Sequence, residues 1–136
     1  MSRELNENEK QKVEASFAHG VEKVTKDDLE KVMSDEKTAQ KKASSLGKQF
    51  GNFVLLWQLL KDYWNNEYTK VPWKFIAAIV FAVGYLVSPF DIIPDFIPII
   101  GFVDDASVFA LVVKSFESEI NDYKQWKDSN DHNQLS

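Results

Sequence analysis

Four aspartates are the residues of this 136-residue chain whose type and spacing could support chemistry. Asp91, Asp95, Asp104 and Asp105 lie in a part of the chain that contains no lysine or arginine. Converging carboxylates are the ligands that hard cations such as Mg²⁺ and Ca²⁺ prefer, and in an apolar setting carboxylates can share a proton. The spacing therefore permits a divalent-cation or proton site built from these four residues.

A structural role explains the same four residues. Asp91 and Asp95 are placed to accept hydrogen bonds from backbone N–H groups at turns. Asp104 and Asp105 immediately precede an apolar helical face, where an aspartate caps free N–H groups and meets the positive end of the helix dipole. Caps and turns are the simpler interpretation, and we favour it.

The composition excludes several classes of active site. Without cysteine the chain can form no disulfide framework, thiolate zinc site, iron–sulfur cluster or cysteine nucleophile. The two histidines, His19 and His132, lie far apart, and no glycine-rich phosphate-binding motif occurs. A formal net charge of −5 argues against nucleic acid, whose binding domains carry basic patches. We therefore expect no enzyme, no nucleic-acid partner and no cofactor other than a divalent cation.

An apolar segment must position these aspartates. The run from Phe75 to Phe90 carries no charge and is apolar on every side. A helix over residues 72–90 would be about 28 Å long, close to the roughly 30 Å of a bilayer core. Such a helix either spans a thin membrane or lies buried in a protein core. We favour a transmembrane helix, because a small domain has few places to bury such a helix completely.

A proline-rich turn joins this segment to a second, weaker apolar stretch. Pro89, Pro94 and Pro98 cannot sit inside one regular helix, because proline lacks the backbone N–H. Gly101 adds a position that is free to adopt a positive φ. The sequence therefore predicts an apolar helical hairpin over residues 72–113, which would span the bilayer, re-enter it or lie buried.

Lysines on both sides of the hairpin predict its orientation. They are Lys61, Lys70 and Lys74 before it, and Lys114, Lys124 and Lys127 after it. Because lysine and arginine accumulate on the cytoplasmic side of membrane proteins, both flanks belong there. We expect a membrane protein with both termini in the cytoplasm.

Residues 1–45 predict a charged, amphipathic helical region. Val13, Phe17 and Val21 recur at helical spacing, and Thr25 followed by Asp28 is typical of a helix start. We interpret this region as a helical appendage. An arm that docks an unknown protein partner is the alternative.

Residues 46–127 predict the main helical domain, which opens with a long aromatic helix. Its apolar face comprises Leu46, Phe50, Phe53, Trp57, Leu60, Trp64 and Tyr68. These aromatic side chains, with Trp73 nearby, suit either a protein core or a bilayer interface. Asn65 and Asn66 should close this helix and Pro72 should open the next one. The polar residues 128–136 predict a disordered tail.

The segment around the proline-rich turn resembles the signature of the YkvA-like family, a small bacterial domain of unknown function. The family pattern is a Tyr, then Ser/Thr-Pro-x-Asp-x-Ile-Pro-Asp, then Ile-Pro-x-x-Gly-x-x-Asp-Asp. The matching residues are Tyr85, Pro89, Asp91, Ile93, Pro94, Asp95, Ile97, Pro98, Gly101, Asp104 and Asp105. The resemblance covers residues 72–113 and implies membrane association. It supplies no catalytic residues. A related domain accompanies the RING of a membrane-bound ubiquitin ligase, but this chain lacks the RING cysteines.

These observations predict an all-α protein that is a non-enzymatic, membrane-associated module, anchored in a membrane and serving in interaction or scaffolding. Two alternatives stay open. One is a membrane-embedded cation or proton site built from the four aspartates. The other is a soluble all-α bundle.

Overall fold

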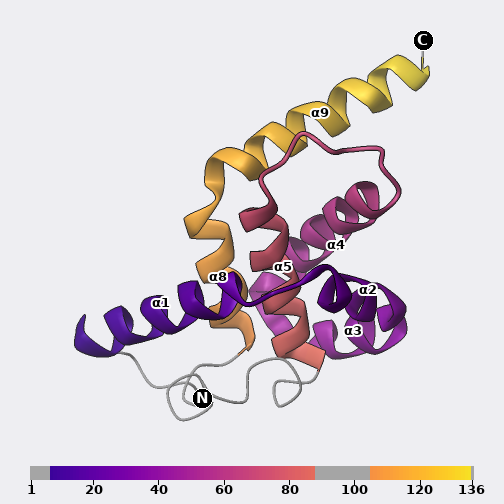
Figure 1. Ribbon diagram of the computed structural model, residues 1–136. Helices are drawn as coiled ribbons and strands as arrows, with labels where there is room; N and C mark the ends of the chain where they lie inside the picture. Colours follow the sequence, from indigo (N-terminus) through magenta and orange to yellow (C-terminus); the bar gives the residue numbers. More distant parts are fainter. Residues whose placement is uncertain (1–6, 88–104, 136) are drawn as a thin grey trace.

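The computed structural model describes residues 7–87 and 105–135, and within these ranges every regular element is a helix. The elements are α1 (Glu7–Glu22), α2 (Lys26–Ser34), α3 (Glu36–Ala43), the 3₁₀ helix η1 (Ser44–Gln49), α4 (Phe50–Trp64), α5 (Trp73–Val87), α8 (Asp105–Ser115) and α9 (Glu117–Leu135) (Figure 1). The predicted all-α class is confirmed.

The local signals for helix ends act as the sequence predicts. The Thr25 hydroxyl accepts the Asp28 N–H at 3.3 Å, and the Asp28 carboxylate accepts the Thr25 N–H at 2.9 Å, which is a capping box for α2. α4 ends before Asn66, whose φ of 62° lies in the left-handed region that asparagine tolerates. The Pro72 carbonyl accepts the Phe75 N–H at 3.1 Å in the first turn of α5.

The aromatic helix is shorter than its apolar face predicts. Gly47 has φ 59° and ψ −121°, a non-helical conformation that interrupts the helix between Leu46 and the start of α4. Leu46 and Tyr68, at the two ends of the predicted face, are nonetheless buried outside α4. Five of the seven positions on the predicted face are buried, whereas Phe50 and Trp64 are exposed. Periodicity also does not register a glycine that adopts a positive φ.

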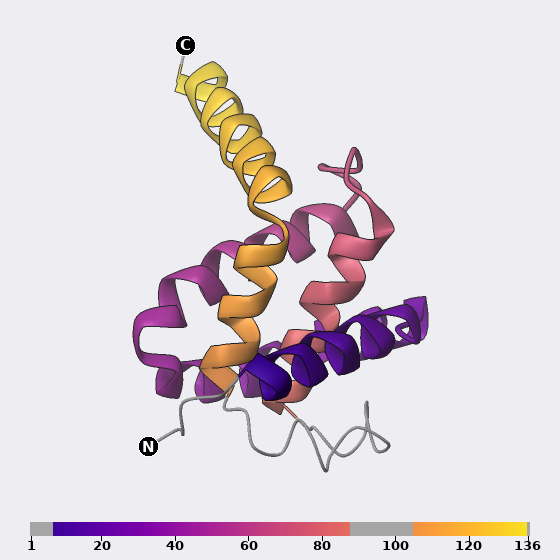
Figure 2. The ribbon, with the colours of Figure 1, turned by 90° about the vertical axis from the view of Figure 1, so that its left-hand side faces the viewer.

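α5 occupies the centre of the molecule. All twelve residues from Phe75 to Leu86 are buried, so this stretch of the helix has no face toward solvent. It contacts α1, α2, α3, α4 and α8, which surround it in both views (Figures 1 and 2). Burial on every side follows from a sequence that is apolar on every side.

The transmembrane helix that we expected over residues 72–90 is not found in the described structure. α5 has 15 residues, about 22 Å, against a bilayer core of about 30 Å. Within residues 7–87 and 105–135 no helix combines the length and the apolar character that a bilayer crossing requires. Neighbouring helices of the same chain cover the described part of this apolar segment.

The two arms of the predicted hairpin pack against each other. α5 and α8 run antiparallel, so that the end of α5 and the start of α8 lie on the same side of the molecule (Figures 1 and 2). Val108, Phe109 and Val112 of α8 are buried in the core that α5 centres. The proline-rich turn between the two arms lies outside the described residues.

The N-terminal helices are part of this core. Phe17 of α1, Leu29 and Val32 of α2, and Ala39 and Ala43 of α3 are all buried in the same cluster as α5. The region 1–45 is therefore no separate appendage in the described structure, because its apolar faces cover the central helix. The sequence pattern indicated the apolar faces of these N-terminal helices but not that they pack against α5.

The C-terminal residues differ from the expected disordered tail. α9 continues to Leu135 and extends away from the body of the molecule (Figure 2). Its first half is anchored by the buried Ile120 and Tyr123. Once a helix is nucleated, each further residue adds a backbone hydrogen bond, which explains how a polar sequence can continue it.

A close crossing of α1 and α5 yields the first prediction. A methyl group at Gly20 would overlap the ring of Phe81, which also packs edge-on against Phe17 at a centroid distance of 5.4 Å. Gly20→Ala should lower the free energy of unfolding in urea by about 1–3 kcal/mol, since the buried ring must move. Gly51→Ala, at a position with no neighbour within 4 Å, is the matched control and should be neutral or slightly stabilising. Equal stabilities of the two variants would contradict the close approach of α1 to the Phe81 ring at Gly20.

Candidate functional site

Most residues of the predicted aspartate site lie outside the described structure. This holds for Asp91, Asp95 and Asp104, and also for Pro89, Pro94, Pro98 and Gly101. Asp105 is the first residue of α8, which confirms its place at a helix start, and Tyr85 is buried in α5. Among the described residues, no three His, Cys, Asp or Glu side chains are grouped closely enough to hold a metal ion.

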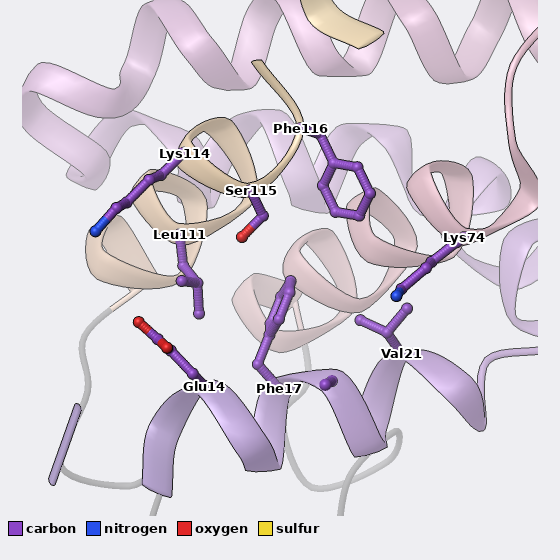
Figure 3. Close-up of a pocket in the computed structure, with 9 residues that line it drawn as sticks. Glu14, Phe17, Val21, Lys74, Leu111, Lys114, Ser115 and Phe116 are labelled. Carbon is purple, nitrogen blue, oxygen red and sulfur yellow. The ribbon is translucent and has the colours of Figure 1, made fainter. Parts of the chain in front are cut away.

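The hollows that the described residues form include three of notable size. One, about 530 Å³, lies between α1 and α8 and reaches the first turn of α5 (Figure 3). The second, about 320 Å³, is a groove between α3 and α4. The third, also about 320 Å³, lies where α2 meets the connection from α4 to α5.

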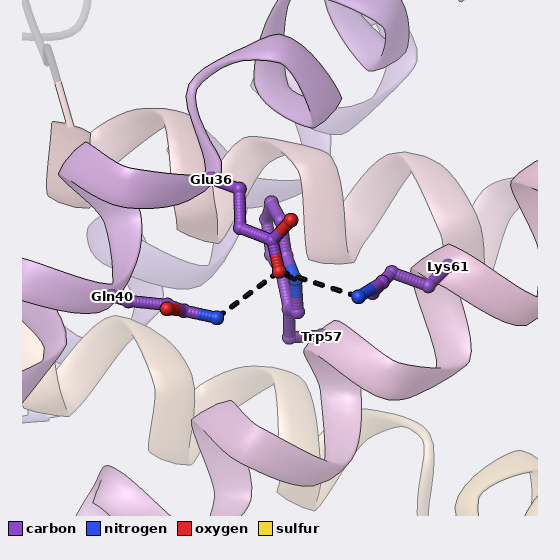
Figure 4. Close-up of polar contacts among 4 residues, drawn as sticks. All are labelled: Glu36, Gln40, Trp57 and Lys61. Atoms are coloured by element: carbon purple, nitrogen blue, oxygen red, sulfur yellow. Dashed lines mark hydrogen bonds and ion pairs between the residues drawn. The ribbon is translucent and has the colours of Figure 1, made fainter.

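One carboxylate oxygen organises the groove between α3 and α4. Glu36 Oε2 accepts hydrogen bonds from Trp57 Nε1 at 3.0 Å and Gln40 Nε2 at 3.1 Å, and it forms an ion pair with Lys61 Nζ at 3.4 Å (Figure 4). Phe50 is exposed on the same groove. Because all three partners bind a single oxygen, we interpret Glu36 as a structural link between the two helices.

The third hollow is lined by aromatic side chains and forms the candidate site. Tyr63 and Trp64 come from the end of α4, Trp73 from the start of α5 and Lys26 from the start of α2. We call these four residues the aromatic–lysine face. Trp64 is 45% exposed although it belongs to an apolar seam, whereas Trp57 on the same helix is buried.

The connection between α4 and α5, residues 65–72, adjoins this face and is attached to α4 by hydrogen bonds to Asp62. The Asp62 backbone carbonyl accepts the N–H groups of Glu67 at 2.8 Å and Tyr68 at 3.1 Å. Its side chain, nearly buried, accepts the Tyr123 hydroxyl at 2.6 Å and pairs with Lys127 Nζ at 3.4 Å. Asp62 thus joins α4, the connection and α9 through one residue.

Aromatic packing completes this support. The Tyr68 ring lies 5.1 Å from that of Tyr123 and 4.8 Å from that of Trp126, centroid to centroid. Burial raises the pKa of the Tyr68 phenol above 10.0, and the nearby Asp122 carboxylate raises it further. The phenol therefore stays neutral to a more alkaline pH than a free tyrosine does.

The sequence did not decide which aromatic residues lie in the core and which lie at the surface, and the structure separates them. Phe53 and Trp57 belong to the core, whereas Trp64 faces outward beside the half-buried Trp73. The Asp62 support was missed, because a lone aspartate inside an apolar helix carries no spacing signal. The one available signal was that Asp62 falls on the buried side of α4.

Removing the Tyr123 hydroxyl tests this support. Tyr123→Phe keeps the ring packing but leaves the Asp62 carboxylate short of one buried hydrogen bond. The free energy of unfolding in urea should fall by about 1–3 kcal/mol. The matched control is Tyr63→Phe, since the Tyr63 hydroxyl bonds to none of the described residues, and it should have no effect. An unchanged stability of Tyr123→Phe would show that the bond contributes nothing.

The raised pKa of Tyr68 yields a prediction for alkaline pH. A phenol whose pKa is raised by folding leaves stability intact below its unfolded value of 10.0 and lowers it as pH rises through the folded value. Tyr68→Phe should therefore weaken the alkaline loss of stability, measured as the urea midpoint against pH. An alkaline decline identical to that of the unmodified chain would contradict this assignment.

Comparison with known proteins places the chain in a family. A family model described as a protein of unknown function, DUF1232, matches residues 76–111. The uncharacterized membrane protein YkvA of Bacillus subtilis strain 168 is 32% identical over 102 residues, which is 65% of this chain and 96% of the Bacillus protein. No solved structure matches. Since the similarity extends over almost the whole Bacillus protein and the sequence carries the proline–aspartate signature, this chain belongs to the YkvA-like family.

Proposed function

We propose that this chain is a non-enzymatic, membrane-associated helical module whose aromatic–lysine face binds the cytoplasmic surface of a membrane. Both termini then lie on the cytoplasmic side. The observation that carries the proposal is the exposure of Trp64, which shares one hollow with Trp73 and Tyr63. A Bacillus relative named as a membrane protein supports it.

The chemistry of this face suits a bilayer interface. Tryptophan and tyrosine concentrate at the headgroup level, because their rings are apolar while their N–H and O–H groups still reach water. Lys26 lines the hollow, and Lys70 lies in the connection between α4 and α5. Lysines near the surface attract the anionic lipids of the cytoplasmic leaflet. Because Asp27 and Asp28 adjoin Lys26, we assign the larger contribution to the aromatic rings.

A role without catalysis is supported by how the polar groups of the described structure are used. No buried side-chain nitrogen or oxygen among the described residues lacks a hydrogen-bond partner. The carboxylates of Asp62 and Glu36 link helices to one another. α9 extends away from the body and offers a surface to an unidentified protein partner, in keeping with a scaffolding role (Figure 2).

Vesicle cosedimentation tests the proposal. The full chain should sediment with vesicles that contain phosphatidylglycerol, and Trp64→Ala should reduce the bound fraction several-fold, because the ring's burial in the interface is lost. Phe50→Ala is the matched control, since Phe50 is equally exposed, 44% against 45%, at the opposite end of the same helix. Binding should be unchanged in this variant.

Two outcomes would contradict the proposal. The first is an absence of vesicle binding by the unmodified chain. The second is an equal loss of binding in Trp64→Ala and Phe50→Ala, which would show that exposed aromatics contribute without regard to their position. Circular dichroism of each variant verifies that the helices are intact.

A further inference from the structure

The hollow between α1 and α8 has features of a ligand-binding site that the proposed function does not use. It is a partly open cavity of about 530 Å³ between α1 and α8, a volume within the usual range for small-molecule sites (Figure 3). Phe17 and Val21 of α1 form one wall, and Leu111 of α8 with Phe116, which directly follows α8, forms the other. These residues come from helices that are distant in sequence, so only the fold creates the cavity.

The apolar walls are held rigid by the core. Phe17 packs edge-on against Phe81, and Phe116 packs against Phe75 with ring centroids 5.0 Å apart. Phe81 and Phe75 are both fully buried in α5. Because the core fixes these two rings, the cavity is largely formed before a ligand arrives, which lowers the entropic cost of binding.

The charges of the lining are distributed unevenly. Glu14 and Lys114 lie at one end of the cavity, where their charges offset each other, and Lys74 lies at the other end beside Val21 (Figure 3). No described carboxylate forms an ion pair with Lys74. Lys74 is also in the first turn of α5, where the helix dipole adds positive potential. The Ser115 hydroxyl supplies a polar group between the two ends.

We propose that this cavity binds a single-chain anionic amphiphile of the fatty-acid type. The carboxylate pairs with Lys74, and the alkyl chain lies between the apolar side chains of α1 and α8. A cavity with apolar walls, at one end of which Lys74 has no ion-pair partner among the described carboxylates, matches a ligand that has one anionic end and one apolar tail. The site is separate from the aromatic–lysine face, and the proposal does not depend on membrane binding.

Binding of dodecanoate, kept below its micellar concentration and without vesicles, tests this inference by isothermal titration calorimetry on the full chain. Lys74→Ala should weaken dodecanoate binding by about three- to tenfold, since an exposed charge-assisted contact is lost. Dodecyltrimethylammonium, which has the same chain length and the opposite charge, should bind the unmodified chain more weakly than dodecanoate. This preference should shrink in Lys74→Ala. Lys70→Ala, an exposed lysine that does not line the cavity, should bind dodecanoate normally.

A second variant fills the cavity itself. Ala18 lines the cavity and is exposed, so Ala18→Phe should place a ring in the cavity and reduce dodecanoate binding more than about tenfold. Ala15→Phe, at an exposed position of α1 outside the cavity, is the matched control and should bind as the unmodified chain does. Circular dichroism verifies folding, and Lys74→Ala still decides the question if Ala18→Phe does not fold.

The inference is overturned if the unmodified chain does not bind dodecanoate, or if Ala18→Phe and Lys74→Ala both bind it as the unmodified chain does. Equal affinity for the cationic and anionic amphiphiles would also overturn it, because the lysine would then play no part. These measurements contain no vesicles, so their failure leaves the proposed membrane role untouched, and a failure of vesicle binding leaves the cavity untouched.

Discussion

The need to cover α5 on every side organises the described structure. A helix without a polar face gains most when all of its surface leaves water, and a single neighbour can cover only one side. Five helices therefore contact α5, among them the three that precede residue 45. The charged N-terminal region thus serves the most apolar part of the chain, since α1, α2 and α3 turn their apolar faces inward and their charges outward.

The close approach of helices around α5 decides where surface hollows form. At Gly20 the absence of a side chain lets α1 approach the ring of Phe81, and the neighbouring Phe17 is fixed by the same ring. Consecutive residues in the first turn of α5 then serve different hollows. Trp73 lines the aromatic–lysine face, whereas Lys74 lines the cavity between α1 and α8. Both proposals of surface function thus derive from the end of one buried helix.

The local signals for helix ends were accurate at three places, whereas the break at Gly47 was missed. The Thr25–Asp28 capping box, the helix end at Asn65 and the start after Pro72 depend on backbone groups a few residues away, and all are confirmed. The predicted apolar face around α4 is buried at Leu46 and Tyr68, which lie outside α4, but exposed at Phe50 and Trp64. The errors concern partners. The apolar run from Phe75 has the same composition whether lipid or protein surrounds it, and composition alone cannot distinguish the two.

The sequence by itself determined the helical class, the family, the limits of the chain's chemistry and the identity of its most apolar segment. Each of these depends on residue types or on short-range spacing. Only the tertiary structure decided that protein covers the described part of α5, that Trp64 faces outward while Trp57 does not, and that Asp62 joins α4 to α9. These outcomes depend on contacts between residues far apart in the chain, such as Asp62 and Tyr123, which no local pattern encodes.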